Sequence, residues 1–174
     1  MNRKDLKIAI SGKSGCGNTS VSKLLAERLD IRFINFTFRT LAAEQGISLE
    51  EVLQHAAEDD WWDREVDTRQ VALAREDGGC VLGSRLAIWM LPEADLKVYL
   101  KASAHVRAER IQNREGGSLE DIAAFTAERD RQDTERYKKL YSIDNNDYTS
   151  ADLVIDTDKL GIEAIVSLIL KRID

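Results

Sequence analysis

The sequence contains few of the residues that build zinc-binding, disulfide-rich or membrane-spanning proteins. It has two cysteines, two histidines and one proline among 174 residues. Cys16 and Cys80 belong to neither a CxxC motif nor a cysteine–histidine cluster, which argues against a zinc centre and a disulfide scaffold. The longest apolar run falls far short of the roughly 18–20 residues that cross a membrane. We therefore expect a reduced, cytoplasmic protein with no membrane segment.

The sequence also lacks an excess of positive charge. Lys and Arg number 25 and Asp and Glu number 31, so the net charge is −6, which disfavours binding of duplex nucleic acid through a broad basic face. The first seven residues carry charges and lead straight into a strand-like run, so we expect no secretory signal. Hydrophobic residues make up 43% of the chain, which is enough for one domain with its own core.

Short apolar runs alternate with segments of helical periodicity along the whole chain. The runs that we predict to be strands are residues 7–11, 32–36, 80–83, 96–100 and 153–156. A helix is expected directly after the first run, where Val21, Leu25 and Leu29 repeat at intervals of four residues. Alternation of this kind predicts an α/β fold with a parallel sheet that is covered by helices on both faces.

The first strand and the first helix are joined by a glycine-rich loop. Glycines let backbone N–H groups surround an anion, and the helix N-terminus adds partial positive charge, so a strand, such a loop and a helix form a phosphate-binding P-loop. The loop meets the pattern G-x-x-x-x-G-K-[ST] at Gly12, Gly17 and Thr19, but Asn18 stands at the lysine position. The predicted ATP-binding residues are Gly12, Lys13, Ser14, Gly15, Cys16, Gly17, Asn18, Thr19 and Ser20, with Thr19 as the magnesium ligand.

Two questions stay open at this loop. A glycine-rich turn without a ligand is the alternative interpretation, and Asn18 favours it because the missing lysine normally contacts the reacting phosphates. Lys13 is a candidate to supply that charge from the other end of the loop. Cys16 is either a thiol activated by an electropositive loop or a small residue that fits there, and the second interpretation is preferred.

Several further segments occur in an order that is similar to one kinase family. These segments are residues 38–42, 46–51, 63–70, 94–102, 106–111, 114–116, 136–144 and 152–157. Together with the P-loop they resemble the cytidylate kinases, and in particular their short, archaeal-type branch. The resemblance extends from about residue 6 to residue 173, and its strength lies in the common order of the segments.

The resemblance implies ATP-dependent phosphorylation of CMP or dCMP on a three-layer P-loop kinase fold with five parallel strands. It implies one domain over residues 1–174, with a nucleoside-monophosphate-binding insertion at about 36–77 and a lid at about 110–137. The expected cofactor is Mg²⁺, and the expected partners are the nucleotides alone, without nucleic acid or membrane. Neither a heptad seam nor an exposed apolar stripe is evident, so we expect a monomer.

The acceptor site is predicted from arginines and acids. One guanidinium group can bind two phosphate oxygens at once, which favours Arg39 and Arg85 as ligands of the CMP phosphate. The resemblance adds Asp133 for recognition of the acceptor nucleoside. The complete predicted CMP site is Arg39, Asp63, Arg85, Asp133 and Arg136, and the predicted catalytic residues are Lys13, Arg110, Arg114 and Arg129, of which the three arginines belong to the lid by family match.

One further departure from the family pattern concerns the end of the third predicted strand. Where the family usually reads E-G-R-L-A-G-W, residues 83–89 read G-S-R-L-A-I-W, so Arg85 is kept while the acid and both glycines have changed. Two other functions therefore stay open: a kinase for another small acceptor, and a P-loop protein that binds nucleotide without transferring phosphate.

Overall fold

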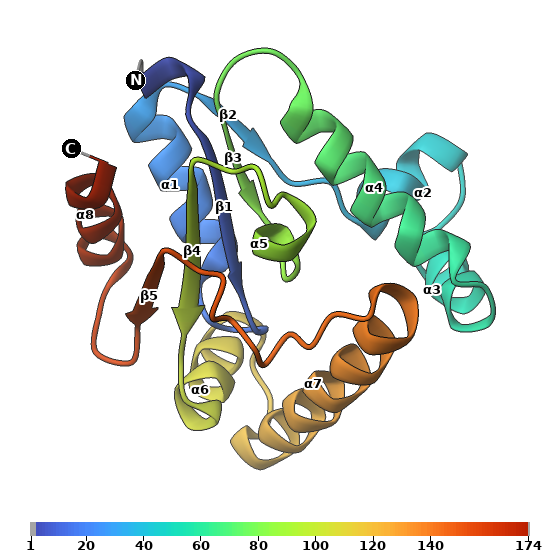
Figure 1. Ribbon diagram of the computed structural model, residues 1–174. Helices are drawn as coiled ribbons and strands as arrows, with labels where there is room; N and C mark the ends of the chain where they lie inside the picture. The colour runs from blue at the N-terminus through green and yellow to red at the C-terminus, as the bar shows by residue number, and fades with distance from the viewer. Residues whose placement is uncertain (1–2, 174) are drawn as a thin grey trace.

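The structure is a computed structural model that describes residues 3–173, and it is built around one parallel sheet (Figure 1). The sheet has the strand order β2-β3-β1-β4-β5. Its strands are β1 (Lys7–Gly12), β2 (Arg32–Ile34), β3 (Cys80–Gly83), β4 (Leu96–Lys101) and β5 (Leu153–Asp156). All five predicted strands are present, and every neighbouring pair is parallel, which confirms the predicted α/β class.

Helices fill the connections between the strands. They are α1 (Asn18–Leu29), α2 (Phe38–Gln45), α3 (Leu49–Glu58), α4 (Trp61–Arg75), α5 (Ala87–Met90), α6 (Ala104–Glu115), α7 (Leu119–Tyr141) and α8 (Ile162–Ile173), with a 3-10 turn at Arg3–Asp5. The turn of helix α5 was not predicted, because four residues are too few to show a helical period.

Two apolar layers hold the helices against the sheet. On one face, Ile8 and Ile10 of β1 pack in a cluster with residues of α1 and α8. On the other face, Ala9 packs with residues of α4 and α5. Alternate residues of β1 therefore point into two different cores, and a strand buried on both faces reads as a continuous apolar run. The result is the three-layer arrangement that the alternation of elements predicts.

The carboxyl ends of the strands determine where a ligand site can form. The strand arrows run toward the side of the molecule occupied by α6 and α7 (Figure 1). In open parallel sheets, ligands bind outside the carboxyl ends of the strands, next to the central strand. The glycine loop leaves β1 at this edge, and the segment that starts at Ser84 leaves the neighbouring strand β3 there.

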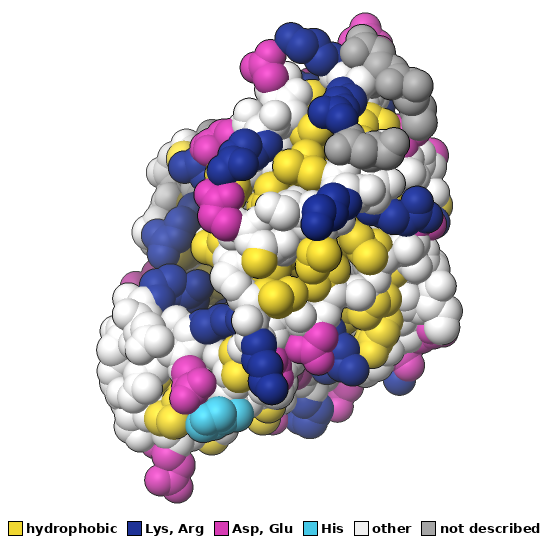
Figure 2. Space-filling model, turned by 90° about the vertical axis from the view of Figure 1, so that its left-hand side faces the viewer, with side chains coloured by type: hydrophobic (Ala, Val, Ile, Leu, Met, Phe, Trp, Pro, Cys, Tyr) yellow, Lys and Arg dark blue, Asp and Glu magenta, His cyan; other side chains and the backbone are white. Residues whose placement is uncertain are grey.

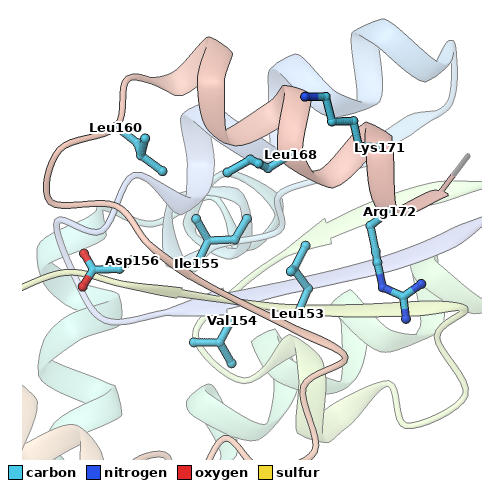
Figure 3. A pocket seen from close by; sticks show the side chains of 8 residues that line it. All are labelled: Leu153, Val154, Ile155, Asp156, Leu160, Leu168, Lys171 and Arg172. Carbon is cyan, nitrogen blue, oxygen red and sulfur yellow. The ribbon is translucent and has the colours of Figure 1, made fainter.

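The outer edge of the sheet carries apolar surface that the sequence did not lead us to expect. Figure 2 shows hydrophobic side chains gathered on this side of the molecule, with Lys and Arg around them. The exposed fractions of Val154, Ile162 and Leu168 are 44%, 42% and 42%. A groove of about 420 Å³ lies between β5 and α8, where Leu153 and Ile155 face Leu168 (Figure 3). None of the predicted site residues lines it. The expectation that no apolar stripe is exposed is therefore wrong; α8 is apolar on most of its circumference, so its pattern does not reveal which side stays uncovered.

No helix within residues 3–173 is both long enough and apolar enough to cross a membrane.

Candidate active site

The glycine loop between β1 and α1 adopts a backbone that its glycines make possible. Gly15 and Gly17 have φ angles of +82° and +92°, in the left-handed region that favours glycine. Gly15 also lies against α6, since a Cβ there would be 2.8 Å from the carbonyl oxygen of Arg107. Helix α1 begins directly after Gly17. The loop, the helix start and the strand end thus have the arrangement that a phosphate-binding loop requires.

The side chain of Asn18 is directed into the protein. Its Nδ2 donates to the carbonyl oxygen of Ile10 at 2.9 Å and to that of Ser84 at 3.3 Å. Its Oδ1 accepts a hydrogen bond of 2.9 Å from Ser22 Oγ, one helical turn further along α1. The residue at the lysine position therefore connects β1, α1 and the segment after β3.

Lys13 and Cys16 differ in burial, although both belong to the glycine loop. Lys13 is partly exposed, and its side chain makes no hydrogen bond or ion pair within the described residues 3–173, so its ammonium group is available to a ligand. Cys16 is 1% exposed, and burial raises the pKa of its thiol. A buried, protonated thiol is a poor nucleophile, which supports the role of a small residue that fits the loop. Cys80 is also buried, and burial raises its pKa as well.

Thr19 and Ser20 are exposed in the first turn of α1. Residues 3–173 contain no group of three or more His, Cys, Asp or Glu side chains arranged to hold a metal. Mg²⁺ keeps several waters and usually shares few protein oxygens with substrate phosphates. One exposed hydroxyl at Thr19 therefore fits a metal that arrives with the phosphates of a nucleotide, and does not fit a metal that resides in the protein alone.

Four of the five residues predicted to bind CMP meet in one charged cluster between α4, α7 and the segment after β3. Asp133 is 5% exposed and accepts a hydrogen bond of 2.9 Å from Arg136 Nη2. Its other oxygen lies 3.4 Å from Arg85 Nη1. Arg136 Nε lies 3.1 Å from Asp63 Oδ1. Two acids thus hold two arginines in place, and an anionic ligand can compete for the same guanidinium groups.

Asp67 extends this cluster by one turn of α4. It accepts a hydrogen bond of 2.7 Å from the hydroxyl of Tyr141, the last residue of α7. The pKa of Asp67 is raised to about 6, mainly by burial and also by the nearby charge of Asp63, while the hydrogen bond from Tyr141 opposes the rise. Burial also raises the pKa of Asp63. The acids of α4 therefore lie in a desolvated part of the site.

The raised pKa of Asp67 makes a prediction about stability. Between its ordinary pKa of 3.8 and about 6, the folded state binds more protons at Asp67 than the unfolded state does, so its contribution to stability falls as the pH rises. Asp67→Asn removes this cost, and we expect it to raise Tm by about 5 °C at pH 8 and to leave Tm unchanged near pH 4. Thermal denaturation of both proteins across this range measures the difference. The control Glu65→Gln, on the same helix beside Arg69, should give no gain; a lower Tm of Asp67→Asn at pH 8 would contradict the prediction.

Arg129 lies between the glycine loop and the charged cluster. It lines a cavity of about 320 Å³ together with Ser14 of the loop and Arg114 of α6. No acid forms an ion pair with it within residues 3–173. Partial burial lowers the pKa of Arg129, and the charge of Arg85 lowers it further. The guanidinium groups of Arg129 and Arg85 repel each other beside the glycine loop, so an anion bound there would be stabilised by both charges.

The remaining predicted arginines have different surroundings. Arg110 donates to the carbonyl oxygen of Thr157 at 2.6 Å and to its Oγ1 at 3.0 Å, and it also reaches the carbonyl oxygens of Gly15 and Cys16 at 3.5 and 3.4 Å. It therefore fixes the loop against the segment after β5. Arg114 is exposed and pairs with Glu115 at 2.7 Å. Arg39 of α2 is exposed, and no contact described within residues 3–173 joins it to the cluster.

A buried ion pair that was not predicted from the sequence supports the site. Arg107 of α6 is 5% exposed; its Nη2 lies 2.6 Å from Asp130 Oδ2, and its Nη1 donates to the carbonyl oxygen of Ser14 at 3.0 Å. This side chain therefore joins α6, α7 and the glycine loop. One signal was present in the sequence: Arg107 lies four residues before the buried Ile111, so it is on the apolar face of α6, where a charge requires a buried partner.

Comparisons with known proteins agree with this arrangement. Residues 7–159 match the Cytidylate kinase-like family. "Cytidylate kinase 2" of Borreliella afzelii is 46% identical over 173 residues, which cover 97% of each chain. "Cytidylate kinase" of Pyrococcus horikoshii is 42% identical over 176 residues, which cover 100% of this chain and 91% of that one. Among solved structures, shikimate kinase from Bacteroides thetaiotaomicron superposes with a TM-score of 0.68 at 15% identity over 97% of this chain and 98% of that chain, which shows a shared fold.

Proposed function

The chain belongs to the cytidylate kinase-like family, and from this premise we propose that it transfers the γ-phosphoryl group of ATP to CMP or dCMP, giving CDP or dCDP. The relatives named cytidylate kinase match almost the whole chain, so the proposal applies to the full sequence and not to a fragment of it. It places the enzyme in the cytoplasm, in keeping with two free, buried cysteines, and it requires residues from one chain only.

In this proposal the donor binds at the loop of residues 12–20. Backbone N–H groups and the start of α1 hold the ATP phosphates, and Lys13 adds positive charge. Thr19 holds Mg²⁺ together with phosphate oxygens. When bound, Mg²⁺ neutralises charge on the phosphates and aligns them. The exposed hydroxyl of Thr19 at the start of the helix supports this assignment.

The acceptor binds at the charged cluster. Arg85 and Arg136 bind the phosphate of CMP, and Asp133 and Asp63, which are buried beside them, accept hydrogen bonds from the nucleoside. Arg39 belongs to this proposal as a residue that approaches the CMP phosphate from α2. Residues 36–77, which include α2, α3 and α4, form the acceptor-binding part, and residues 110–137 form a lid over the donor.

The position of Arg129 is the single observation that carries the proposal. It lines one cavity with Ser14 of the donor loop, and it lies close enough to Arg85 of the acceptor cluster for that charge to lower its pKa. A group at this point is suited to the phosphoryl group as it moves between the two sites, with Arg110 and Arg114 contributing positive charge from α6. Phosphoryl transfer depends mostly on such alignment and charge neutralisation.

The reaction requires little proton transfer from the protein. An oxygen of the CMP phosphate attacks the γ-phosphorus of ATP, a new P–O bond forms, and the bond to the β-phosphate oxygen breaks, so that ADP leaves. A phosphate oxygen is already a competent nucleophile at neutral pH. The proposal therefore assigns no residue as general base.

The test is the release of ADP from Mg-ATP with CMP, dCMP, UMP, AMP or GMP as separate acceptors, beside a sample without acceptor. We expect turnover only with the cytidine nucleotides. Turnover with another acceptor alone would assign a different substrate to the same site. Folded protein that binds ATP but shows no acceptor-dependent turnover would overturn the proposal and identify a nucleotide-binding protein without transferase activity.

A further inference from the structure

Asn18 occupies the position where the P-loop pattern has a lysine, but both ends of its amide are hydrogen-bonded within the protein. The carbonyl oxygens of Ile10 and Ser84 only accept hydrogen bonds, so the amide nitrogen must face them and the amide oxygen must face Ser22 Oγ. Three of the four hydrogen bonds that this amide can make are thus formed within the protein.

Gly83 leaves the space that this arrangement needs. A Cβ at Gly83 would lie 2.5 Å from Ser22 Oγ and 2.8 Å from Ser22 Cβ, which is too short for a real contact, and 3.0 Å from Asn18 Oδ1, which is tighter than most real contacts. Ser22 is fully buried, so it has little room to move aside. The departure from the P-loop pattern at position 18 and the departure from the family pattern at position 83 therefore lie next to each other and form one structural unit.

We propose that Asn18 is a positioning residue that fixes the donor loop relative to Arg85, and that positions 18, 22 and 83 act together in this role. The inference rests on the proposed function, because it assigns the loop to ATP and Arg85 to CMP. Asn18 is the first residue of α1, directly after the loop, and the carbonyl group that it binds at Ser84 directly precedes Arg85. Ser84 N also donates to the carbonyl oxygen of Ile10 at 3.1 Å, so both segments converge on one acceptor.

Loss of the Asn18 side chain should affect the rate of transfer more than the binding of either substrate. Each substrate still meets its own binding groups when Asn18 is shortened, but the separation between the two phosphates is less well defined. Small misplacements reduce the rate of a two-substrate reaction far more than they reduce the affinity for either substrate. In this arrangement the positive charge near the transferring phosphate comes from Lys13, Arg129 and the two lid arginines of α6, and position 18 contributes none.

The first test compares Asn18→Ala with wild-type protein. We expect kcat to fall by about 10- to 100-fold, with the dissociation constants of a non-hydrolysable ATP analogue and of CMP, each measured alone, within about twofold of wild type. Asn146→Ala, which removes an exposed amide that donates to Asp144 in the segment after α7, is the matched control and should behave like wild type. A large loss of affinity for the ATP analogue with unchanged kcat would instead identify Asn18 as a ligand of ATP and overturn the inference.

The second test does not depend on activity. Asn18→Ala and Ser22→Ala each remove one side of the same hydrogen bond, so the losses of Tm in the double variant should be clearly smaller than the sum of the two single losses. Additive losses would overturn the inference. This cycle still tests the coupling of positions 18 and 22 if the acceptor assay shows no kinase activity, so the failure of the proposed function is distinguishable from the failure of the inference.

The third test restores the lysine. Asn18→Lys removes the hydrogen bonds to Ile10 and Ser84 and places a longer, charged side chain beside Ser22. We expect a lower Tm and a kcat/KM below that of wild type. A kcat/KM above that of wild type, or tighter binding of the ATP analogue, would show that position 18 still serves the phosphates and would overturn the inference.

Discussion

Arg129→Ala is expected to lower kcat/KM for CMP by about 100- to 1,000-fold without lowering Tm. Arg129 stands between the loop proposed for the donor and the cluster proposed for the acceptor, and within residues 3–173 no acid forms an ion pair with it. In the proposed reaction its removal takes away charge that stabilises the transferring phosphoryl group. It breaks no ion pair of the described protein, and it relieves repulsion from Arg85.

The neighbouring Arg131 provides the control for this prediction. Arg131 lies two residues further along α7, is exposed, and pairs with Glu128 and Glu135. Exposed pairs of this kind contribute little to stability, so Arg131→Ala should keep both the activity and the Tm of wild type. Steady-state kinetics with Mg-ATP and CMP, together with thermal denaturation, measure both quantities. Equal activity of Arg129→Ala and Arg131→Ala would remove Arg129 from the reaction.

Asp130→Asn is expected to lower Tm by about 10 °C. Asp130 forms two hydrogen bonds with Arg107, whose side chain is almost fully buried against the donor loop. Neutralising one partner of a buried ion pair leaves the other charge without compensation and costs about 3–5 kcal/mol, which in a domain of this size corresponds to a shift of that order in Tm. The same change should weaken ATP binding, because Arg107 also holds the carbonyl group of Ser14.

A matched exposed pair on the same helix tests whether burial is the cause. Glu135→Gln makes the same change from carboxylate to amide, one to two turns further along α7, at a side chain paired with Arg131 on the surface. It should leave Tm within about 1 °C of wild type. Chemical denaturation at pH 7 gives the corresponding free energies of unfolding. A loss for Asp130→Asn no larger than that for Glu135→Gln would show that the Arg107 pair does not support the fold.

The sequence predicted most of the fold because its local signals are consistent with one another. Short apolar runs predicted the strands. The reciprocal hydrogen bonds of Ser48 and Glu51 at the start of α3 are a local signal of the same kind, a capping box between residues three apart. Such signals depend on neighbours in the chain. Strand order depends on which strands pair across the sheet, and the sequence alone did not predict the placement of β1 between β3 and β4.

The candidate site was predictable to the extent that its residues follow a motif. The glycine loop and the set of arginines and acids on α7 were identified from pattern and resemblance. The partners of those side chains were not, because Asp130 and Arg107 are 23 residues apart and Asp67 and Tyr141 are 74 apart. No local pattern encodes such a distance. The same holds for Asn18. The sequence showed only that a lysine is missing, whereas the structure shows that the amide donates to the carbonyl oxygens of Ile10 and Ser84.

The burial of both cysteines has a practical consequence for measuring conformational changes by fluorescence. Cys16 is 1% exposed and Cys80 is fully buried, and burial raises the pKa of each thiol, so neither reacts readily with maleimide dyes in the folded protein at neutral pH. Cysteines introduced at exposed positions such as Asn113 and Lys23 can therefore carry a fluorophore pair without removal of the native thiols. Energy transfer between these sites on α6 and α1 would report directly whether nucleotide brings the two helices together.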